Sequence, residues 1–173
     1  MAMVMMRSLF PVFICTLGLL SCGQPPREAD NETLKQGNRS TTLSADTAKL
    51  SKIIDLSTYR PFNAKFKYVF IDNSGQNERL SVPGPSDSYL EAVLYFDSTA
   101  FNQIRAKYFN TEYSSPGFNK QSFNFEWLDA QTRAELLRTD TSYHGHPDSL
   151  FGSGARGKLW FLRNKILLTE STM

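Results

Sequence analysis

The sequence predicts an α+β domain, built on a mainly antiparallel sheet of about five strands that two or three helices cover. Residues 62–71 and 89–96 carry the alternating apolar pattern of strands, and a stripe of apolar residues at helical spacing follows Asp97. Strands and helices do not alternate regularly along the chain, as they would in a parallel sheet. The length of 173 residues is about that of one domain.

Composition excludes several classes of protein. The chain is 40% hydrophobic and 21% charged, with a formal net charge of +2. These values exclude a multi-span membrane protein and a fully disordered chain. A nucleic-acid-binding domain concentrates basic residues far more strongly, so we predict no nucleic-acid partner.

The folded part is expected to begin near Leu43 with a short amphipathic helix over 44–56. Leu50, Ile53 and Ile54 recur there at helical spacing. Pro61 prevents the helix from continuing, because proline lacks the amide hydrogen and its ring clashes with the preceding turn.

Three strands come next. The first covers 62–71 and ends at the turn signal of residues 72–75. Residues 79–82 are expected to pair back as a short strand, and residues 89–96 form the clearest strand of the chain.

Two aspartates stand where helix N-caps are expected, because a short polar side chain can accept from the first free backbone amides of a helix. Asp97 precedes an apolar stripe. Its members are Phe101, Ile104, Tyr108 and Phe109. Asp129 is expected to cap a second helix that runs through Arg138, with Ala134 and Leu137 on the inner face.

Two further regions have the sequence pattern of strands. Phe123, Phe125 and Trp127 alternate as a third main strand would. Residues 158–162 and 165–169 form either one long strand or a hairpin closed at 163–164, and we favour the hairpin.

The N-terminus has the features of a secretory signal peptide. Arg7 precedes an apolar run over 9–20 that contains no charge. The run is shorter than the roughly 20 apolar residues that span a bilayer. Pro11 and the apolar character on every side argue against a buried N-terminal helix.

The segment Leu19-Leu20-Ser21-Cys22-Gly23 resembles the lipobox of bacterial lipoprotein precursors. The resemblance implies acylation of Cys22 on its sulfur and cleavage after Ser21. Leu20 departs from the pattern, in which a smaller residue is commoner, and ordinary signal-peptidase cleavage or an uncleaved anchor are the alternatives. Because Gly23 and not Asp follows the cysteine, the resemblance favours an outer-membrane location.

The resemblance implies a signal peptide at 1–21 and lipidation at Cys22. Composition and patterning then predict a lipidated N-terminus with a flexible spacer at 22–42 and a single globular domain at 43–173. Only Ala29 and Leu34 are apolar between residues 23 and 42, which predicts a spacer that cannot bury enough surface to fold. Beyond Cys22 the chain has no cysteine, so the domain holds no disulfide or cysteine-ligated metal.

Two motifs suggest chemistry. Residues 152–158 match a phosphate-binding loop through Lys158, but Leu159 follows where Ser or Thr would bind magnesium. His144, His146 and Asp148 would share one side of an extended segment and could bind a metal, although a polar surface turn explains them better.

Hydrolase signatures are weak. No Gly-x-Ser-x-Gly elbow lies between a strand and a helix. Glu126 beside Trp127 suggests glycoside cleavage, but an exposed strand residue explains it equally well. We therefore predict no catalytic residue, no metal ligand and no cofactor.

A binding surface is harder to dismiss than a catalytic site. Between Phe109 and Trp127, aromatic residues such as Tyr113 and Phe118 interleave with amide side chains, and flat rings with polar edges can bind a sugar or a peptide. A core role for these rings is favoured. The basic residues Arg156, Lys158, Arg163 and Lys165 suit either a membrane surface or the protection of an edge strand.

Together these features predict a lipid-anchored cell-envelope protein, attached through Cys22 with its domain outside the cytoplasm. Its expected role is a non-catalytic binding or assembly module for a protein or glycan of the envelope. The alternative is an exported hydrolase or a metal-dependent envelope enzyme.

Overall fold

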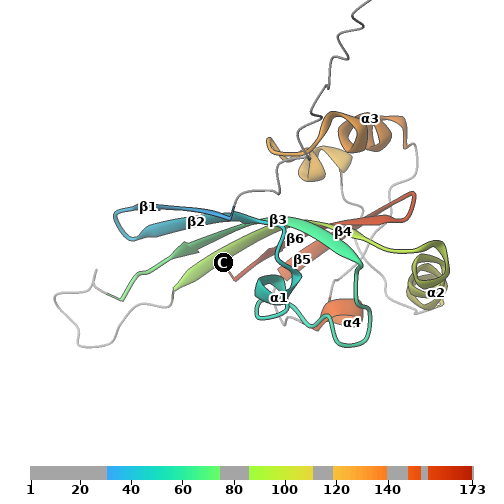
Figure 1. The fold of residues 1–173 in the computed structure, drawn as a ribbon, viewed down its shortest axis with the longest axis horizontal. Helices are drawn as coiled ribbons and strands as arrows, with labels where there is room; N and C mark the ends of the chain where they lie inside the picture. The colour runs from blue at the N-terminus through green and yellow to red at the C-terminus, as the bar shows by residue number, and fades with distance from the viewer. Residues whose placement is uncertain (1–30, 75–85, 111–118, 140–147, 153–155, 173) are drawn as a thin grey trace, which may run out of the picture.

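The computed structural model describes residues 31–74, 86–110, 119–139, 148–152 and 156–172. Its centre is a six-stranded antiparallel sheet in the order β1-β2-β3-β4-β6-β5 (Figure 1). The strands are β1 (Glu32–Gln36), β2 (Arg39–Ser44), β3 (Asn63–Ile71), β4 (Asp87–Tyr95), β5 (Arg156–Leu162) and β6 (Lys165–Ser171). The helices are α1 (Thr47–Leu50), α2 (Ser98–Phe109), the 3-10 helix η1 (Lys120–Phe123), α3 (Ala130–Arg138) and α4 (Asp148–Phe151). The predicted α+β class is confirmed.

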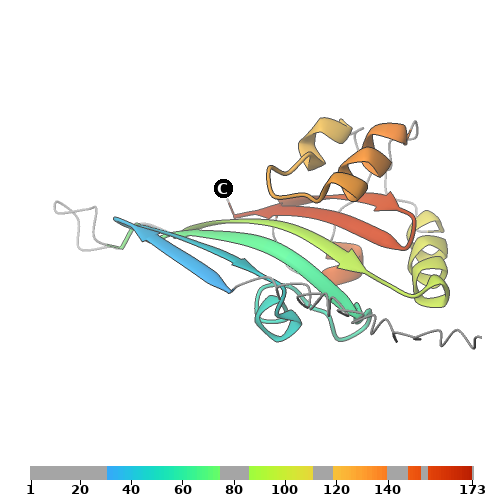
Figure 2. The same ribbon diagram turned by 45° about the horizontal axis from the view of Figure 1, so that its top comes forward.

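Helices cover both faces of the sheet, as Figure 2 shows. Side chains alternate across a strand, so each strand contributes to two cores. On one face Phe66 and Leu94 pack with α1, α2 and α4. On the other face Val93 and Trp160 pack with η1 and α3. We call this second side the α3 face.

The flexible spacer predicted at 22–42 is wrong from Glu32 onward. Residues 32–44 form the β1–β2 hairpin, in which β2 pairs with β3 along its whole length. Gly37, at φ +60°, supplies the left-handed conformation that the two-residue turn needs. Few of the hairpin's side chains are buried. The hairpin is folded because the backbone of β2 pairs with β3. The hydrophobicity of the hairpin's own residues does not indicate this pairing.

The helix predicted at 44–56 is shorter in the structure. Ser44 is the last residue of β2, and Asp46 caps α1 by accepting from the amides of Ala48 and Lys49. Tight turns continue the chain after Leu50, and Ile54 is buried as expected.

Several predicted elements are confirmed. The strands β3 and β4 match 62–71 and 89–96 within two residues. The carboxylate of Asp97 accepts from the amides of Thr99 and Ala100 and starts α2, and Asp129 caps α3. β5 and β6 pair as the hairpin expected at 163–164.

Two predictions about the α3 face are wrong. Phe123, Phe125 and Trp127 do not form a strand: Phe123 ends η1, whose start Asn119 caps by accepting from the amide of Gln121. Turns and 3-10 helix thus mimic the period of a strand while Phe123 and Phe125 still reach the core. Thr132 and Leu136, not Ala134 and Leu137, are the buried residues of α3. Thr132 can be buried because its hydroxyl donates to Asp129 Oδ2 at 2.8 Å.

No helix within the described part of the chain is long and apolar enough to cross a membrane. The short strand predicted at 79–82 lies outside the described residues.

Candidate functional site

A groove of about 200 Å³ lies on the α3 face, beside the first three strands. We call it the Trp127 groove. Its lining comes from β1, β2, β3 and the segment before α3, and consists of Glu32, Leu34, Thr41, Leu43, Lys67, Glu126 and Trp127. The strand register explains this gathering, because residues directly opposite one another in paired strands point to the same face.

Two cross-strand rows build the floor of the groove. Glu32 pairs with Leu43, which pairs in turn with Lys67. Leu34 pairs with Thr41 in the next row. In the first row the apolar Leu43 therefore lies between two opposite charges.

The indole of Trp127 forms a wall of the groove and is held from three directions. Its Nε1–H donates to Glu91 Oε2 at 2.6 Å. Its ring stacks on Phe125, with centroids 5.3 Å apart and an interplanar angle of 21°. The Lys65 ammonium lies 5.6 Å from the ring centroid. The tryptophan is thus fixed in place, and its π surface already has two neighbours.

Glu91 links the groove to the centre of the sheet. It lies opposite Lys67 in the register of β3 and β4, so opposite charges face each other across the strands. Burial raises the pKa of the nearby Tyr89 phenol, and the Glu91 carboxylate, which accepts from that hydroxyl, raises it further. The tyrosine is therefore a neutral donor at ordinary pH, which suits a structural or binding role.

The edge strand β1 borders the groove. It is first in the strand order, and every one of its residues is exposed. Leu34 is 62% exposed, which makes it one of the large apolar side chains left open in the described structure. An exposed edge beside an apolar side chain is able to bind another extended segment.

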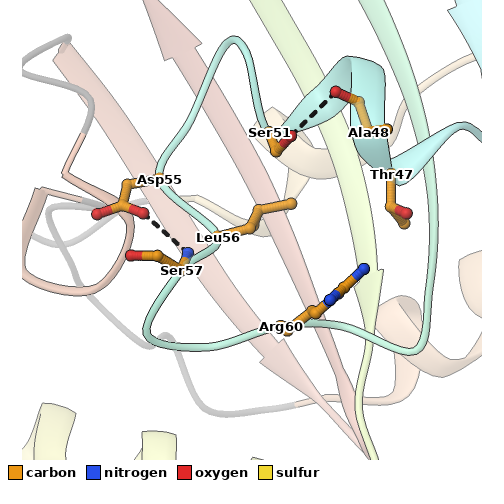
Figure 3. A pocket seen from close by; sticks show the side chains of 7 residues that line it. All are labelled: Thr47, Ala48, Ser51, Asp55, Leu56, Ser57 and Arg60. Carbon is orange, nitrogen blue, oxygen red and sulfur yellow. Dashed lines mark hydrogen bonds between the residues drawn. The ribbon is translucent and has the colours of Figure 1, made fainter.

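A second pocket, of about 360 Å³, lies between α1 and the loop that follows it (Figure 3). Its polar groups include Asp55, Ser57 and Arg60. Asp55 Oδ1 accepts from the Ser57 amide at 2.8 Å. Hydrogen bonds from the Ser57 hydroxyl and amide lower the pKa of Asp55, so it stays ionised. In Figure 3 Arg60 extends toward Thr47 and away from that carboxylate, so the charged groups do not converge on one point.

The lipid site predicted at Cys22 lies outside the described residues, and so does most of the metal site considered as an alternative. Cys22, His144 and His146 lie outside them, and Asp148 is placed only as the first residue of α4. Within the described ranges, no three His, Cys, Asp or Glu side chains cluster as metal ligands would. The metal site, and the metal-dependent enzyme that would need it, stay alternatives to the predicted absence of a metal ligand.

The helix that should follow a phosphate-binding loop is not found after the sequence match at 152–158, because the described residues from 156 form a strand. Gly157 and Lys158 lie inside β5, so a strand stands where the amides of a helix would face a phosphate. The strand that was expected after this loop is confirmed.

The predicted aromatic surface divides between core and exposed residues. Phe123 and Phe125 are buried, as the favoured core interpretation expects, whereas Phe109 is 51% exposed. Tyr113 and Phe118 lie outside the described residues. Of the basic residues, Lys165 forms an ion pair with Glu135 at 2.7 Å.

Most of the groove was missed from the sequence. The predicted spacer included Glu32, Leu34 and Thr41. Nothing in the sequence indicated that Leu43 pairs with Lys67 across neighbouring strands. The dipeptide Gly37-Asn38 was the available signal, since a glycine followed by asparagine between two extended runs favours a two-residue hairpin.

Comparison of the chain with protein-family models, with curated proteins and with solved structures found no match.

Proposed function

We propose that this chain is a lipid-anchored protein of the bacterial cell envelope, and that its domain binds an extended segment of a partner protein along β1 and in the Trp127 groove. The observation that carries the proposal is the exposed edge strand beside a groove whose tryptophan is held in place. The lipobox-like segment that ends at Cys22 supports the anchor.

An edge strand next to a groove suits strand addition. In that mode the backbone of the partner adds a strand to the sheet, while its alternate side chains enter adjacent pockets. The exposed position of Leu34 places an apolar contact at the start of the groove. Every second side chain of an added strand would point to the α3 face, where the one nearest Leu34 would contact it.

The charges of the groove favour a basic residue in the partner. Among the described residues of the lining, Glu32 and Glu126 stand against one cation, Lys67. A segment that carries an apolar residue next to Lys or Arg would complement both features.

A protein segment fits the groove better than a sugar does. A sugar would stack on the open face of an aromatic ring, whereas Trp127 is already in contact with Phe125 and Lys65. The sequence also suggested a glycan as the partner. The crosslinking experiment below distinguishes a glycan from a protein segment.

The proposed anchor limits how far strand β1 can lie from the bilayer. Nine residues separate Cys22 from Glu32. Even fully extended, they span about 30 Å. Strand β1 would thus stay near the membrane surface, which favours a partner in the same membrane.

The test is site-specific photocrosslinking in intact cells, with a photoreactive aromatic residue in place of Leu34. The matched control carries the same residue at Leu137, which is 59% exposed on α3. We expect a discrete adduct with an envelope protein from position 34 and none from position 137. Glu126→Lys in the position 34 variant should weaken the adduct, because it removes the attraction for a basic residue.

Equal adducts from both positions, or an adduct that Glu126→Lys does not change, would contradict the proposal. Recovery of a glycan without a protein at position 34 would also contradict it.

A further inference from the structure

The outer edge of β1 carries a defined set of backbone hydrogen-bonding groups. β1 is the first strand of the sheet, and among the described strands it pairs with β2 alone (Figure 2). All five of its residues are exposed. The edge is therefore open to another extended strand, and the register of the sheet determines which strand fits it.

The register of β2 against β3 fixes the direction of the backbone groups of β2. The Asp72 amide donates to the Asn38 carbonyl at 2.8 Å, just before β2 begins. In an antiparallel pair, every second residue forms such hydrogen bonds to the same neighbour. The even-numbered residues of β2 therefore turn their backbone groups toward β3. The odd-numbered residues, Thr41 and Leu43 among them, turn theirs toward β1.

The same alternation fixes the direction of the backbone groups of β1. Leu34 lies opposite Thr41, so its N–H and C=O groups face β2. The next residue on either side turns its groups to the other edge of the strand. The N–H and C=O groups of Thr33 and Lys35 thus point outward, away from β2. An added strand has to place its own free groups opposite these two residues.

A second copy of β1 meets this requirement. We propose that two copies of this chain pair antiparallel through β1, about a two-fold axis at Leu34. In this register Thr33 of each copy lies opposite Lys35 of the other, so the outward groups of both copies form four backbone hydrogen bonds. Within the bounds of β1, an axis at Thr33 or at Lys35 gives only two such bonds. An axis at Lys35 would also set two like charges opposite each other.

The side chains of β1 suit the same register. Leu34, which is 62% exposed, faces Leu34 of the second copy in a non-hydrogen-bonded pair, in which the Cα atoms lie about 4.5 Å apart. The two apolar side chains therefore cover each other on the α3 face. Glu32 lies opposite Gln36 of the second copy, and Lys35 lies opposite Thr33. No like charges face each other across this pairing.

The contact is small, and the proposed anchor compensates for its size. Two five-residue strands bury far less than the roughly 1,200 Å² of a stable interface, so the pair is transient in dilute solution. Anchored copies share one membrane plane, which raises their local concentration. The first residues of the two strands lie about 14 Å apart. Each nine-residue tether spans up to about 30 Å, so both anchors reach the same bilayer.

Self-pairing occupies the edge that the proposed partner segment would use. Both occupants need the outward backbone groups of Thr33 and Lys35, so the two states exclude each other. The second copy therefore covers the edge until a partner segment displaces it. This regulation rests on the proposed function, whereas the self-pairing itself does not.

The test is disulfide trapping of the purified chain from residue 22 onward with Cys22→Ser. This chain contains every described residue and no cysteine, so Leu34→Cys supplies the sole thiol. Cα atoms about 4.5 Å apart lie within the range that a disulfide bridges. The matched control is Leu137→Cys, at a leucine that is 59% exposed on α3. We expect mild oxidation to trap the Leu34→Cys dimer about tenfold faster, because pairing raises the effective concentration of the second thiol.

Two further variants test the register and the backbone bonds. Thr33→Cys alone should be trapped slowly, because in the proposed register the two thiols are offset by two residues along the strands. An equimolar mixture of Thr33→Cys and Lys35→Cys should give the mixed dimer, since these positions lie opposite each other. Lys35→Pro in the Leu34→Cys chain should abolish trapping, because proline lacks the outward N–H. Its circular dichroism should stay unchanged, since β2 does not use that amide.

Three results would overturn the proposal. They are equal trapping at positions 34 and 137, trapping of Thr33→Cys as fast as Leu34→Cys, and trapping that Lys35→Pro does not reduce in a folded chain. If Lys35→Pro unfolds the chain, the position 33 variants decide. No partner protein is present in this assay, so its failure leaves the photocrosslinking test in cells intact. A missing adduct in cells likewise leaves the self-pairing intact.

Discussion

Replacement of Trp127 by Phe tests whether the Trp127 groove is held in a fixed shape by its own hydrogen bond. The change keeps an aromatic ring against Phe125 but removes the Nε1–H that donates to Glu91 at 2.6 Å. A hydrogen bond to a charged group contributes about 1.5–3 kcal/mol. Both side chains are only half-buried, so water replaces part of the lost bond. We therefore expect the free energy of unfolding to fall by about 1.5 kcal/mol, at the lower end of that range.

Urea denaturation followed by circular dichroism measures this loss. Glu126→Gln is the matched control, because Glu126 is an exposed carboxylate of the same groove, and its effect should stay within about 0.5 kcal/mol. A double-mutant cycle with Glu91→Gln should show a coupling of about 1 kcal/mol between the two side chains. If Trp127→Phe and Glu91→Gln add within about 0.3 kcal/mol, the hydrogen bond does not hold the tryptophan and the reasoning is refuted.

Three further predictions concern the contacts that hold the helices on the sheet. Phe151→Ala should lower the free energy of unfolding by about 3–5 kcal/mol in the same assay, because the ring is fully buried. Glu135→Gln should cost about 1 kcal/mol through loss of the Lys165 ion pair, and amide exchange at the β5–β6 turn should rise. Burial alone would raise the pKa of Asp129, but hydrogen bonds from the Thr132 amide and hydroxyl hold it below 3.8. Its stabilising effect is present above pH 3.8 and is lost as pH falls through the lower folded pKa, so Asp129→Asn should reduce the acid dependence of stability.

For each of these predictions, one experimental outcome would contradict it. A loss below about 1 kcal/mol for Phe151→Ala would show that α4 does not seal the core. Unchanged exchange at the turn in Glu135→Gln would show that the contacts of Glu135 on α3 do not hold the β5–β6 turn. An Asp129→Asn variant with the acid sensitivity of the parent protein would assign that sensitivity to other carboxylates.

The elements that could be predicted from the sequence are those that local chemistry determines. Asp97 and Asp129 each precede an amphipathic run, and a carboxylate that accepts from the first amides of a helix needs no distant partner. The strands β3 and β4 carry enough alternating apolar residues to be recognised alone. The β5–β6 hairpin likewise depends on two apolar runs that are adjacent in the sequence.

The elements that could not be predicted depend on tertiary pairing. Strand β2 is mostly polar and exists because β3 provides its hydrogen bonds. Phe123 and Phe125 reach the core through a 3-10 turn, which the alternation of apolar residues does not distinguish from a strand. The Trp127 groove combines both difficulties, since its floor is the missed hairpin and its wall is the misassigned segment.

Intact-mass spectrometry of the protein purified from its native membrane tests the proposed lipid anchor most directly. The proposal predicts a chain that starts at Cys22 and carries added acyl mass, and a Cys22→Ala variant that lacks this mass and leaves the membrane fraction. A native chain that still starts at Met1, or that begins at Cys22 without acyl mass, would contradict it.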